Sequence, residues 1–467
     1  MSKSAVEVHE IDTALVNALP PDSLFAVGGR VRDQVRGEIE NFTPAQKDLD
    51  YVVCGVHEED LRKCLQKLGP VNFVGASFSI FKVTIAEHTV DVALPRRERS
   101  TGIGHRDFEV VSGPEIPLSD DLARRDFRMN MMARSLPGDE LVDPYGGRDD
   151  LAAHRIDILS AHAFEEDPLR MLRAAQFAAR FEYDVSPNLR AAMEASAPMV
   201  TSVSGERVAE ELAKLCRDAA RPSNGLELLR ETGVLREIWP ELLEGVGVEQ
   251  NEWHAYDVYR HTLATVDATP PGDLVLRLAA LFHDVGKPRT KEGPHFYRHE
   301  HVGHDLVREM LGRVRFSNGI IDRVAHLVCQ HMYSADPYLS DAGIRRFIRR
   351  IGPANLEHQF ALRAADAAGS GLPKREDGNA QFERRVWAEV QRKPAFSVRD
   401  LAVDGTAVME ALKARGAADA HYRGDRRVGD ALEWLFEQVT EAPERNERTS
   451  LLALLNDYLD AAEKARA

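Results

Sequence analysis

The sequence predicts an α+β protein, with a mixed head of strands and helices followed by a long all-helical body. Short apolar runs rich in β-branched residues fill the first 150 or so residues, whereas from about residue 160 apolar residues recur every three or four positions. Gly-, Pro- and Asp-rich stretches mark the clearest linkers, at 136–150, 267–274 and 370–379. We therefore expect four regions: a head at 1–155, a helical neck at 156–250, a third region at 251–375, and a helical tail at 376–467.

Four runs of the head have the length and composition of strands. They are LFAVG at 24–28, DLDYVVCG at 48–55, SIFKVTI at 79–85 and TVDVAL at 89–94. A glycine pair ends the first run, and the segment at 31–37 is expected to form a short helix after it. The helical pattern of the body is clearest at 167–181, 206–219, 224–239 and 452–467.

Composition limits the class of protein. The 467 residues carry a formal net charge of −15 and an ordinary share of apolar residues, and no run is long enough to span a membrane. The N-terminus lacks the order of a secretory signal, and the four cysteines form no CxxC pair, so we expect a cytoplasmic protein without membrane contact. The acidic balance argues mildly against a nucleic-acid partner, because phosphate binding depends on Lys and Arg.

The first candidate site is the glycine turn Gly28-Gly29, which is followed by Arg32 at the start of the expected helix. Glycines let backbone amides approach a phosphate, and a helix N-terminus favours anions. A simple turn is the more common explanation for a lone glycine pair.

The second candidate site is a set of carboxylates in strands. Asp48 and Asp50 are two residues apart, so they point to one face of a strand about 6–7 Å from each other. Such a pair suits Mg²⁺, which takes oxygen ligands and shares them with substrate phosphates. Asp91, in the strand at 89–94, is a candidate third ligand; a polar strand edge explains each acid equally well when taken alone. Together with the glycine turn, these acids predict metal-assisted nucleotidyl transfer.

The head resembles the bacterial tRNA nucleotidyltransferase and poly(A) polymerase family, a branch of the polymerase-β-like superfamily. The blocks that carry the resemblance cover about residues 20–235 in order. They are VGGRVRD at 27–33, DLDYVV at 48–53, DLARRDF at 121–127 with Asn130, DPYGG at 143–147 with Asp150-Leu151, EDPLR at 166–170 with Arg173, and SGER at 204–207.

The resemblance implies a polymerase-β-like nucleotidyltransferase head, Mg²⁺ as its cofactor, and CTP and ATP as substrates for template-independent addition of CCA to the tRNA 3′ end. The same resemblance implies catalytic roles for Asp48, Asp50 and Asp91. It further implies nucleotide contacts from Gly28, Gly29, Arg32, Asp121, Arg124, Arg125, Asp126, Asn130, Asp167, Arg170 and Arg173.

Asp167 and Arg170 have a physical rationale as a base-reading pair. Residues three apart share a helix face, so the carboxylate would accept from the exocyclic amine of cytosine or adenine while the guanidinium donates to the adjacent ring nitrogen. Uracil and guanine present the opposite order and would leave buried charges unpaired. The alternative is a helix start with Asp167 as N-cap and Pro168 at the first helical position.

Three further features bear on the nucleotide site. Arg170, Arg173 and Arg180 fall close together on one helix face and predict a phosphate-facing stripe. Arg128 and Gln176 depart from the family, which commonly has Thr and Arg there. The charged, glycine-containing segment at 95–110 resembles the loop with which CCA-adding members switch from CTP to ATP; an ordinary exposed loop is the alternative.

The body contains a histidine-aspartate cluster, with nine of the 17 histidines between 254 and 331. The order His261, His283-Asp284 and Asp366 resembles the HD phosphohydrolase superfamily, an all-helical fold that binds divalent metal. Imidazole and carboxylate ligands suit a transition metal or Mn²⁺, which would activate water against a phosphoester such as a 2′,3′-cyclic phosphate or a 2′-nucleotide. His299, His301, His304 and His331 lie around this core in the sequence.

The main hypothesis is thus a CCA-adding enzyme with an HD domain, and three alternatives stay open. They are an A-adding, CC-adding or poly(A) polymerase of the same fold, an HD phosphohydrolase with a degenerate head, and a non-catalytic RNA-binding protein. Arg345, Arg346, Arg349 and Arg350 form a cationic run that we interpret as a salt-bridged face rather than an RNA contact. The sequence does not set the oligomeric state.

Overall fold

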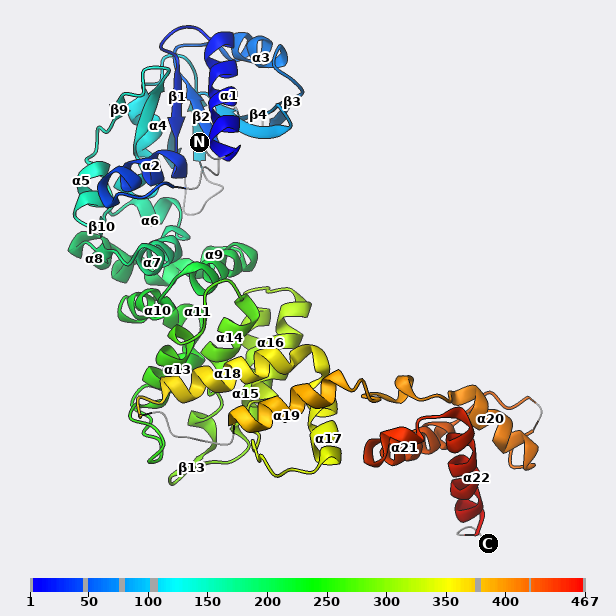
Figure 1. The fold of residues 1–467 in the computed structure, drawn as a ribbon. Helices are drawn as coiled ribbons and strands as arrows, with labels where there is room; N and C mark the ends of the chain where they lie inside the picture. Colours follow the sequence, from blue (N-terminus) through cyan, green and yellow to red (C-terminus); the bar gives the residue numbers. More distant parts are fainter. Residues whose placement is uncertain are drawn as a thin grey trace. The chain divides into compact units, whose positions relative to one another are not determined.

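The chain forms two compact units in the computed structural model (Figure 1). The structure describes residues 3–44, 49–74, 80–100, 108–373, 379–419 and 421–464. Met1–Glu244, Pro270–Leu274 and Glu309–Ser317 form the first unit, and Gly245–Thr269, Val275–Arg308 and Asn318–Ala467 form the second. The four regions expected from the sequence stay a prediction.

A seven-stranded mixed sheet forms the head, in the order β3-β4-β5-β2-β1-β8-β9. Only β2 and β5 pair in parallel; the other neighbours are antiparallel. All four predicted strands are present within a few residues of their expected bounds, and the mixed α+β class is confirmed. The strands are β1 (Leu24–Val27), β2 (Asp50–Val53), β3 (Val71–Val74), β4 (Ile80–Ile85), β5 (His88–Ala93), β8 (Ala133–Leu136) and β9 (Leu141–Val142).

The two faces of the sheet differ in what covers them. Helices α1 (Lys3–Ala18) and α3 (Glu58–Gln66) pack on one face, where Leu15, Leu61 and Val92 are fully buried. Side chains alternate between the two faces along each strand. Val52 lies on the other face, in a smaller apolar cluster, and Asp50 and Asp91 point to the same face as Val52. The catalytic candidates therefore lie on the face opposite α1 and α3.

Helix α2 (Gly29–Glu40) follows β1 directly, two residues earlier than the sequence predicted. Short helices and strand pairs complete the first unit, apart from the neck helices. They are α4 (Leu118–Ala123), α5 (Gly147–Ala152), α6 (Ala163–Glu166), the 3₁₀ segments η1 (Arg128–Asn130) and η2 (Ala197–Ser202), and the pairs β6 (Arg96–Ser100) with β7 (Phe108–Ser112) and β10 (Arg155–Ile156) with β11 (Asp184–Val185).

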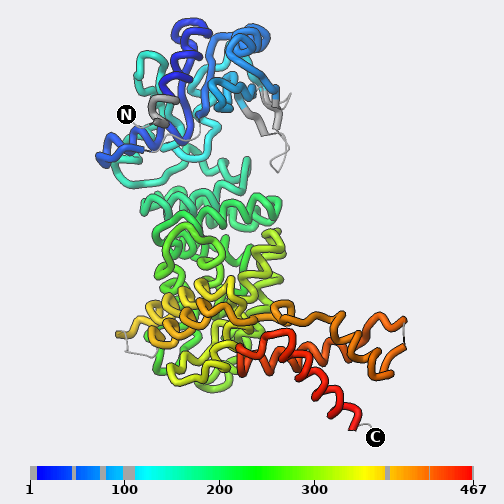
Figure 2. The backbone as a smooth tube through the Cα atoms, turned by 45° about the vertical axis from the view of Figure 1, so that its right-hand side comes forward, coloured from blue at the N-terminus to red at the C-terminus, as the bar shows by residue number. Residues whose placement is uncertain are grey.

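The neck is a stack of helices (Figure 2). Its first helix begins at Arg170, three residues after Asp167, whose backbone is extended. The single helical pattern expected at 224–239 forms two helices instead, broken at Gly233, whose φ of +80° is a left-handed value that favours glycine. The helices are α7 (Arg170–Phe181), α8 (Pro187–Ser196), α9 (Gly205–Asp218), α10 (Pro222–Glu231), α11 (Val234–Ile238) and α12 (Pro240–Leu243).

The second unit is helical apart from one short strand pair, β12 (Lys291–Glu292) with β13 (His295–Phe296), among the residues the structure describes. Its amphipathic helices bury their apolar faces against one another, as the sequence pattern predicts. Two of its helices share residues with the first unit, which includes Leu274 and the last residues of α15, from Glu309 on. The helices are α13 (Val258–Asp267), α14 (Leu274–Phe282), α15 (His299–Arg313), α16 (Asn318–Gln330), α17 (Asp341–Ile351), α18 (Leu356–Gly369), α19 (Asn379–Gln391), α20 (Gly405–Ala414), α21 (Arg426–Glu441) and α22 (Arg448–Lys464), with 3₁₀ segments η3 (Pro288–Thr290), η4 (Pro353–Asn355), η5 (Val398–Asp400) and η6 (Pro443–Arg445).

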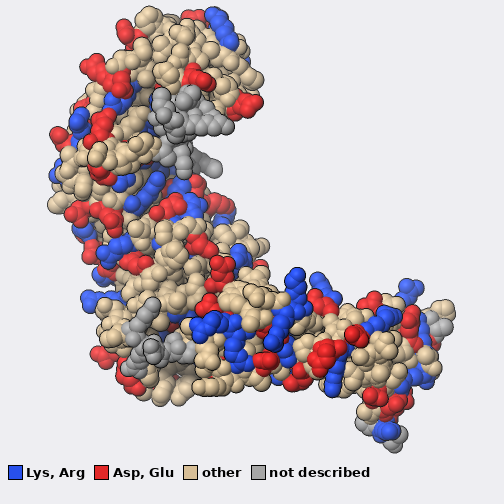
Figure 3. Space-filling model, viewed as in Figure 1, with Lys and Arg blue, Asp and Glu red and all other residues tan. Residues whose placement is uncertain are grey.

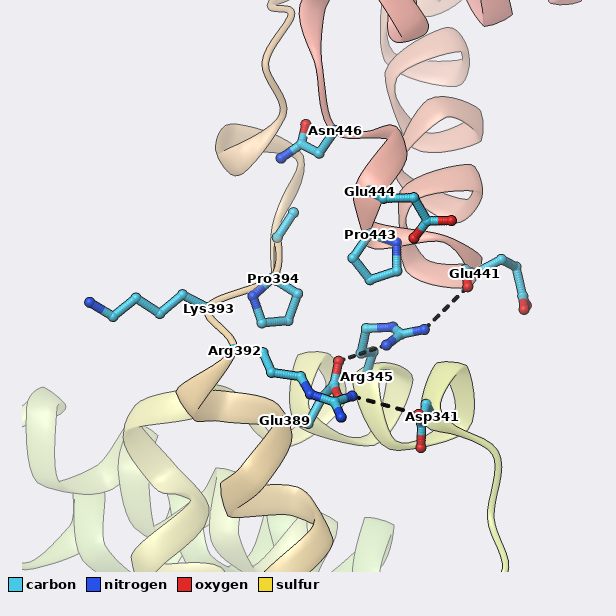
Figure 4. Close-up of a pocket in the computed structure, with 11 residues that line it drawn as sticks. Asp341, Arg345, Glu389, Arg392, Lys393, Pro394, Glu441, Pro443, Glu444 and Asn446 are labelled. Atoms are coloured by element: carbon cyan, nitrogen blue, oxygen red, sulfur yellow. Dashed lines mark hydrogen bonds and ion pairs between the residues drawn. The ribbon is translucent and has the colours of Figure 1, made fainter.

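The arginine run of α17 faces protein groups. Arg345 is buried, and its Nη1 lies 2.6 Å from Glu389 Oε1 (Figure 4). Its Nε donates to the Thr440 carbonyl at 2.6 Å. Arg346 and Arg349 form ion pairs with acidic side chains of α21. The salt-bridged interpretation holds for these three arginines.

Replacing Arg345 by Met is expected to lower the free energy of unfolding of the second unit by about 3 kcal/mol. The substitution removes the buried guanidinium that pairs with Oε1 of Glu389, a side chain only 4% exposed, and leaves that carboxylate with Arg392 on its other oxygen. Urea unfolding followed by circular dichroism checks this. The matched control Arg346→Met, in an exposed pair, is expected to cost below about 1 kcal/mol. Equal losses in the two variants would contradict the buried-pair interpretation.

Candidate functional site

A polar cavity of about 450 Å³ lies in the first unit, on the side of the sheet opposite helices α1 and α3. Five elements or connections contribute to its wall: the N-terminus of α2, the start of β2, the segment between α4 and η1 with the end of η1, and helices α7 and α9. The lining residues are Gly28, Gly29, Arg32, Asp50, Arg125, Asp126, Asn130, Arg173, Gln176, Phe177, Arg180, Glu211 and Lys214. Eight of these thirteen are among the predicted site residues.

Gly28 brings backbone into close approach with a carboxylate. Its φ of +75° and ψ of −147° form a conformation nearly confined to glycine. A Cβ at this position would lie 3.1 Å from Asp50 Oδ2. The glycine therefore sets the N-terminus of α2 against Asp50, with the helix N-terminus and the carboxylate sharing one cavity.

Alanine at position 28 is expected to reduce the specificity constant (kcat/KM) for nucleotide incorporation at least about tenfold, because both the backbone strain and the Cβ displace Asp50 from the α2 N-terminus. Steady-state incorporation kinetics measure the effect. The matched control is Gly55→Ala, since Gly55 also has a positive φ (+71°) but a Cβ there meets nothing within 4 Å. Similar losses in both variants would show that strain alone, and not the contact with Asp50, is responsible.

Asp91 lies opposite Asp50 in the parallel pair of β2 and β5, so the two carboxylates share a face of the sheet. Lys82 Nζ, from the next strand, is 2.8 Å from Asp91 Oδ1. This lysine, which supplies a cation to Asp91, was not among the residues predicted from the sequence. Asp48 lies outside the described residues. The carboxylate oxygens of Asp50 and Asp91 are the hard donors that suit Mg²⁺.

A chain of hydrogen bonds connects the elements of the cavity wall. Arg32 Nη1 donates to Asn130 Oδ1 at 3.1 Å, and Asn130 Nδ2 donates to Asp126 Oδ1 at 2.8 Å. Asp126 Oδ2 accepts from Arg173 at 2.6 and 2.8 Å. Burial by itself raises the pKa of Asp126, but the charge of Arg173 and the hydrogen bond from Asn130 outweigh it, so the pKa lies below its usual value. Asp126 thus stays ionised and positions Asn130 and Arg173 at the cavity.

Asp121 positions Arg125 in a similar way. The side chain of Asp121 is fully buried and accepts from Arg124 at 2.8 Å and from Arg125 at 3.2 Å. Burial raises the pKa of Asp121, but the charges of Arg124 and Arg125 outweigh it and lower the pKa below its usual range. Of these three predicted residues, only Arg125 lines the cavity.

The proposed base-reading pair has other partners in this structure. Asp167 lies between α6 and α7, so the assumption that a helix spaces it from Arg170 is wrong. Asp167 Oδ1 accepts from the Leu169 amide at 3.2 Å, as a capping residue would, and its Oδ2 is 2.8 Å from Arg207. Arg170 donates to the Arg124 carbonyl at 2.6 Å and pairs with Glu166 at 3.0 Å.

The two departures from the family have separate surroundings. Arg128 forms two 2.8 Å hydrogen bonds with the buried carboxylate of Asp150, so it ties η1 to α5. Gln176 is 3% exposed and lines the cavity, and its Nε2 has no hydrogen-bond partner among the described residues. Of the predicted cationic stripe, Arg173 and Arg180 line the cavity, whereas Arg170 is buried beside Arg124.

Three further residues of the cavity wall were not predicted from the sequence: Phe177, Glu211 and Lys214. Phe177 packs beneath the guanidinium of Arg32, whose centre is 5.1 Å from the ring centroid. Lys214 Nζ is 3.0 Å from Glu211 Oε1, one turn away on α9. The sequence carries no distinctive signal for Glu211 and Lys214, because α9 has other charged residues such as Glu210 and Arg217.

The segment predicted as a switching loop is described in part. Arg96–Ser100 and Phe108–Ser112 form the antiparallel pair β6 and β7, and residues 101–107 lie outside the described residues.

The histidine-aspartate cluster is assembled in the second unit, from helices α13 and α18 and the residues that follow α14. His261 on α13 and Asp366 on α18 lie 3.1 Å apart, from Nε2 to Oδ1, beside His283 and Asp284 at the end of α14. The Nε2 atoms of His261 and His283 are also 3.1 Å apart, and His283 Nε2 is 3.1 Å from Asp284 Oδ2. All four predicted ligands thus converge, and their imidazole and carboxylate donors fit a divalent transition metal or Mn²⁺.

The cluster attracts positive charge. Burial lowers the pKa of His283, but the carboxylates of Asp284 and Asp366 outweigh it and raise that pKa above its usual value. Burial raises the pKa of Asp284, but the charges of His283 and Lys287 outweigh it and hold the pKa well below its usual range. Lys287 Nζ is 2.6 Å from Asp284 Oδ2.

Three family models match this chain in order. They are described as the Poly A polymerase head domain, at residues 24–157, the probable RNA and SrmB-binding site of polymerase A, at 182–245, and the HD domain, at 254–368. No described helix is long and apolar enough to cross a membrane.

Curated relatives are similar over most of their length. The multifunctional CCA protein of Cupriavidus metallidurans is 35% identical over 366 residues, which are 74% of this chain and 84% of the relative. The protein of the same name from Nitrosococcus oceani is 34% identical over 84% of this chain and 96% of its own. Among solved structures, a Bacillus stearothermophilus CCA-adding enzyme in complex with CTP matches with a TM-score of 0.70 at 22% identity, over all of both chains. A Thermotoga maritima CCA-adding enzyme complexed with tRNA matches with a TM-score of 0.56 at 18% identity, over 98% of this chain and 96% of that one. At these identities the structures show a shared fold.

Proposed function

Because this chain belongs to the family of the multifunctional CCA proteins, we propose that it adds C, C and A to the 3′ end of tRNA, using CTP and ATP. The chain is an enzyme of the tRNA nucleotidyltransferase class. The observation that best supports the proposal is the pair Asp50 and Asp91 on one face of the sheet, with Asp50 against the N-terminus of α2 in a cavity edged by Arg32 and Arg173.

The proposed reaction is an in-line displacement at the α-phosphorus of the nucleoside triphosphate. The 3′-hydroxyl oxygen of the tRNA forms the new bond to this phosphorus, the bond to the β-phosphate oxygen breaks, and pyrophosphate leaves while the hydroxyl proton is released. Asp50, with Asp48 and Asp91, would hold Mg²⁺, which when bound favours ionisation of the hydroxyl and neutralises the triphosphate. The α2 N-terminus, Arg32 and Arg173 stabilise the triphosphate charge, and Asp126 keeps Arg173 directed to the cavity.

Base selection is proposed to use Asp167 and Arg170. The carboxylate would accept from the exocyclic amine of cytosine or adenine, and the guanidinium would donate to the adjacent ring nitrogen. Arg207 and Glu166 hold the two side chains near the start of α7. Gln176 is a further polar group at the cavity, with a donor that lacks a described partner.

Binding of tRNA is compatible with the net charge of −15. Lys and Arg side chains are mixed with Asp and Glu over the face seen in Figure 3, so a broad cationic surface is absent from the described part of that face. Local cations such as Arg173, Arg180 and Lys214 line the cavity. We therefore propose a confined contact with the tRNA 3′ end and weak binding to nucleic acid in general.

The experiment that tests the proposal gives the purified protein three tRNA transcripts, ending before CCA, after CC, and after CCA, with each nucleoside triphosphate supplied separately. The expected result is C on the first transcript, A on the second, and nothing on the third. Addition of A alone would indicate an A-adding enzyme, addition of C alone a CC-adding enzyme, and repeated A on the complete transcript a poly(A) polymerase. No incorporation into any transcript would overturn the proposal.

A second activity is proposed for the HD domain, namely metal-dependent hydrolysis of phosphate esters such as 2′,3′-cyclic phosphates or 2′-nucleotides. The convergence of His261, His283, Asp284 and Asp366 supports it, and these residues would hold the metal, which when bound supplies a nucleophilic water at neutral pH. Lys287 fixes the orientation of Asp284.

A further inference from the structure

A closed polar network forms where α1, α2 and β2 meet. Asp12 of α1 accepts from both terminal nitrogens of Arg30, the second residue of α2, with Nη1 2.9 Å from Oδ1 and Nη2 2.5 Å from Oδ2. Tyr51 of β2 donates its hydroxyl to Asp12 Oδ1 at 2.6 Å and accepts from Arg30 Nη1 at 3.2 Å. One carboxylate therefore connects all three elements, and none of these three described residues lines the nucleotide cavity.

The groups of this network are shielded from water. The side chains of Asp12 and Arg30 are 14% and 6% exposed, and Tyr51 is buried in the apolar cluster under α1. Burial and the negative charge of Asp12 raise the pKa of Tyr51 above its usual value, so the hydroxyl stays protonated and donates. Two parallel hydrogen bonds between a guanidinium and a carboxylate fix direction as well as distance. The network is therefore a rigid joint between α1, α2 and β2.

Two members of the network are direct chain neighbours of residues at the cavity. Arg30 follows Gly29 at the start of α2, and Tyr51 follows Asp50 in β2. Side chains alternate along a strand, so Tyr51 points to the side that α1 covers while the carboxylate of Asp50 points to the cavity. A shift of Arg30 relative to Tyr51 is therefore also a shift of the α2 N-terminus relative to Asp50.

Helix α2 is held at its N-terminus from two sides. Arg30 and Arg32 are two residues apart, so their side chains leave the helix in directions about 200° apart. Arg30 reaches α1, whereas Arg32 donates to Asn130 in the cavity wall at 3.1 Å. The space between the helix start and β2 is narrow, because a Cβ at Gly28 would lie 3.1 Å from Asp50 Oδ2. A misplacement of about 1 Å in such a site costs about a hundredfold in rate.

We propose that Asp12, Arg30 and Tyr51 are positioning residues of the nucleotidyltransferase site. They set the distance between the N-terminus of α2 and the carboxylate of Asp50, from the side of the sheet opposite the substrate. The inference rests on the proposed function, because it assigns the network to the placement of Mg²⁺ and the triphosphate. A buried ion pair adds little net stability compared with apolar residues of similar size. Removal of all three polar groups together is therefore expected to change the site more than the stability.

The test compares the full-length wild type with the triple variant Asp12→Leu/Arg30→Met/Tyr51→Phe, which leaves no charge or hydroxyl of the network unpaired. Calorimetric titration with CTP in the absence of tRNA, once in Mg²⁺ and once in EDTA, measures how much Mg²⁺ adds to nucleotide affinity. This gain is expected to fall about tenfold in the variant, whereas the affinity in EDTA and the thermal unfolding midpoint stay close to the wild-type values. The single-turnover rate of C incorporation at saturating CTP is expected to fall at least about tenfold.

Two single variants complete the design. Arg36→Met removes an ion pair with Glu40 further along α2, at 2.8 Å and outside the cavity wall, and is expected to keep both the gain in affinity and the rate of incorporation. Arg30→Lys keeps a positive charge beside Asp12 but lacks the planar fork, so a smaller loss in the same direction is expected. This variant also decides the outcome if the triple variant does not fold.

A wild-type gain in affinity and a wild-type rate in the folded triple variant, or in Arg30→Lys, would overturn the inference, since the network would then serve only the fold. Equal losses of CTP affinity in Mg²⁺ and in EDTA, together with a lower unfolding midpoint, would overturn it as well. A wild type that incorporates no nucleotide, but whose Mg²⁺-dependent CTP affinity is lost in the triple variant, would instead contradict the proposed CCA addition and leave the positioning network standing.

Discussion

Asp50→Asn is expected to lower the rate of nucleotide incorporation into tRNA by at least about a thousandfold, which corresponds to about 4 kcal/mol of transition-state stabilisation. The substitution keeps the shape of the side chain but removes the negative charge that is proposed to hold Mg²⁺ against the substrate phosphates. Single-turnover incorporation of C and A at saturating nucleotide measures the effect. The position of Asp50 beside Gly28 and opposite Asp91 is the structural reason for expecting so large a loss.

The matched control for this prediction is Asp60→Asn. Asp60 is an exposed residue of α3, paired with Lys63, on the helix that covers the opposite face of the sheet. It is expected to incorporate nucleotides at the wild-type rate. A rate for Asp50→Asn within tenfold of the wild type, with an unchanged thermal unfolding midpoint, would mean that Asp50 is not a ligand of the catalytic metal.

Asp284→Asn is expected to lower the rate of hydrolysis of a 2′,3′-cyclic phosphate by at least about a thousandfold. The rates of C and A addition are expected to stay at the wild-type values. The carboxylate faces His283, His299 and Lys287, so its charge is central to any cation bound there. Release of the monoester from a cyclic nucleotide, measured at fixed Mn²⁺ concentration, checks the first part. The tRNA transcript assay checks the second.

Asp305→Asn is the control for the second variant. Asp305 is exposed on α15 and contacts His304, which is also outside the cluster. It is expected to leave both activities unchanged. Retention of hydrolysis in Asp284→Asn would exclude the HD cluster as the hydrolytic site, and loss of CCA addition in the same variant would show that the two activities are not separable. Each of the variants Asp50→Asn and Asp284→Asn is expected to keep the activity that the other loses, and the retained activity shows that the variant is folded.

Much of the fold was predictable because local periodicity depends on few residues at a time. The strands at 24–28, 48–55, 79–85 and 89–94 were found from apolar runs with β-branched residues. Strand β3 (Val71–Val74) was not, because its alternation is short and Phe73 is partly exposed. The break between α10 and α11 was missed because Gly233 interrupts an apolar pattern that continues in phase on either side.

The candidate sites divide in the same way. The sequence contains the residue types that indicate nucleotidyl transfer and an HD cluster, in a recognisable order. Gly28 and Asp50 each belong to a short motif, and His283 and Asp284 are adjacent. The sequence does not show which residues of a motif line the cavity and which position other side chains. Asp126 and Asp121 position arginines at the cavity, and Asp167 has Arg207 as its partner 40 residues away.

By itself the sequence determined the α+β class, most elements of the head and neck, the carboxylates available for Mg²⁺ and the H…HD…D order of the body. These follow from patterns that repeat over two to four residues and from the chemistry of single side chains. Only the tertiary structure decided that Arg32 meets Asn130, 98 residues away, that Arg345 is buried against Glu389, and that His299 and His331 face Asp284. The physical reason is that such contacts depend on how whole helices and strands pack, and the packing is set by the summed burial of many apolar side chains rather than by the residues that meet.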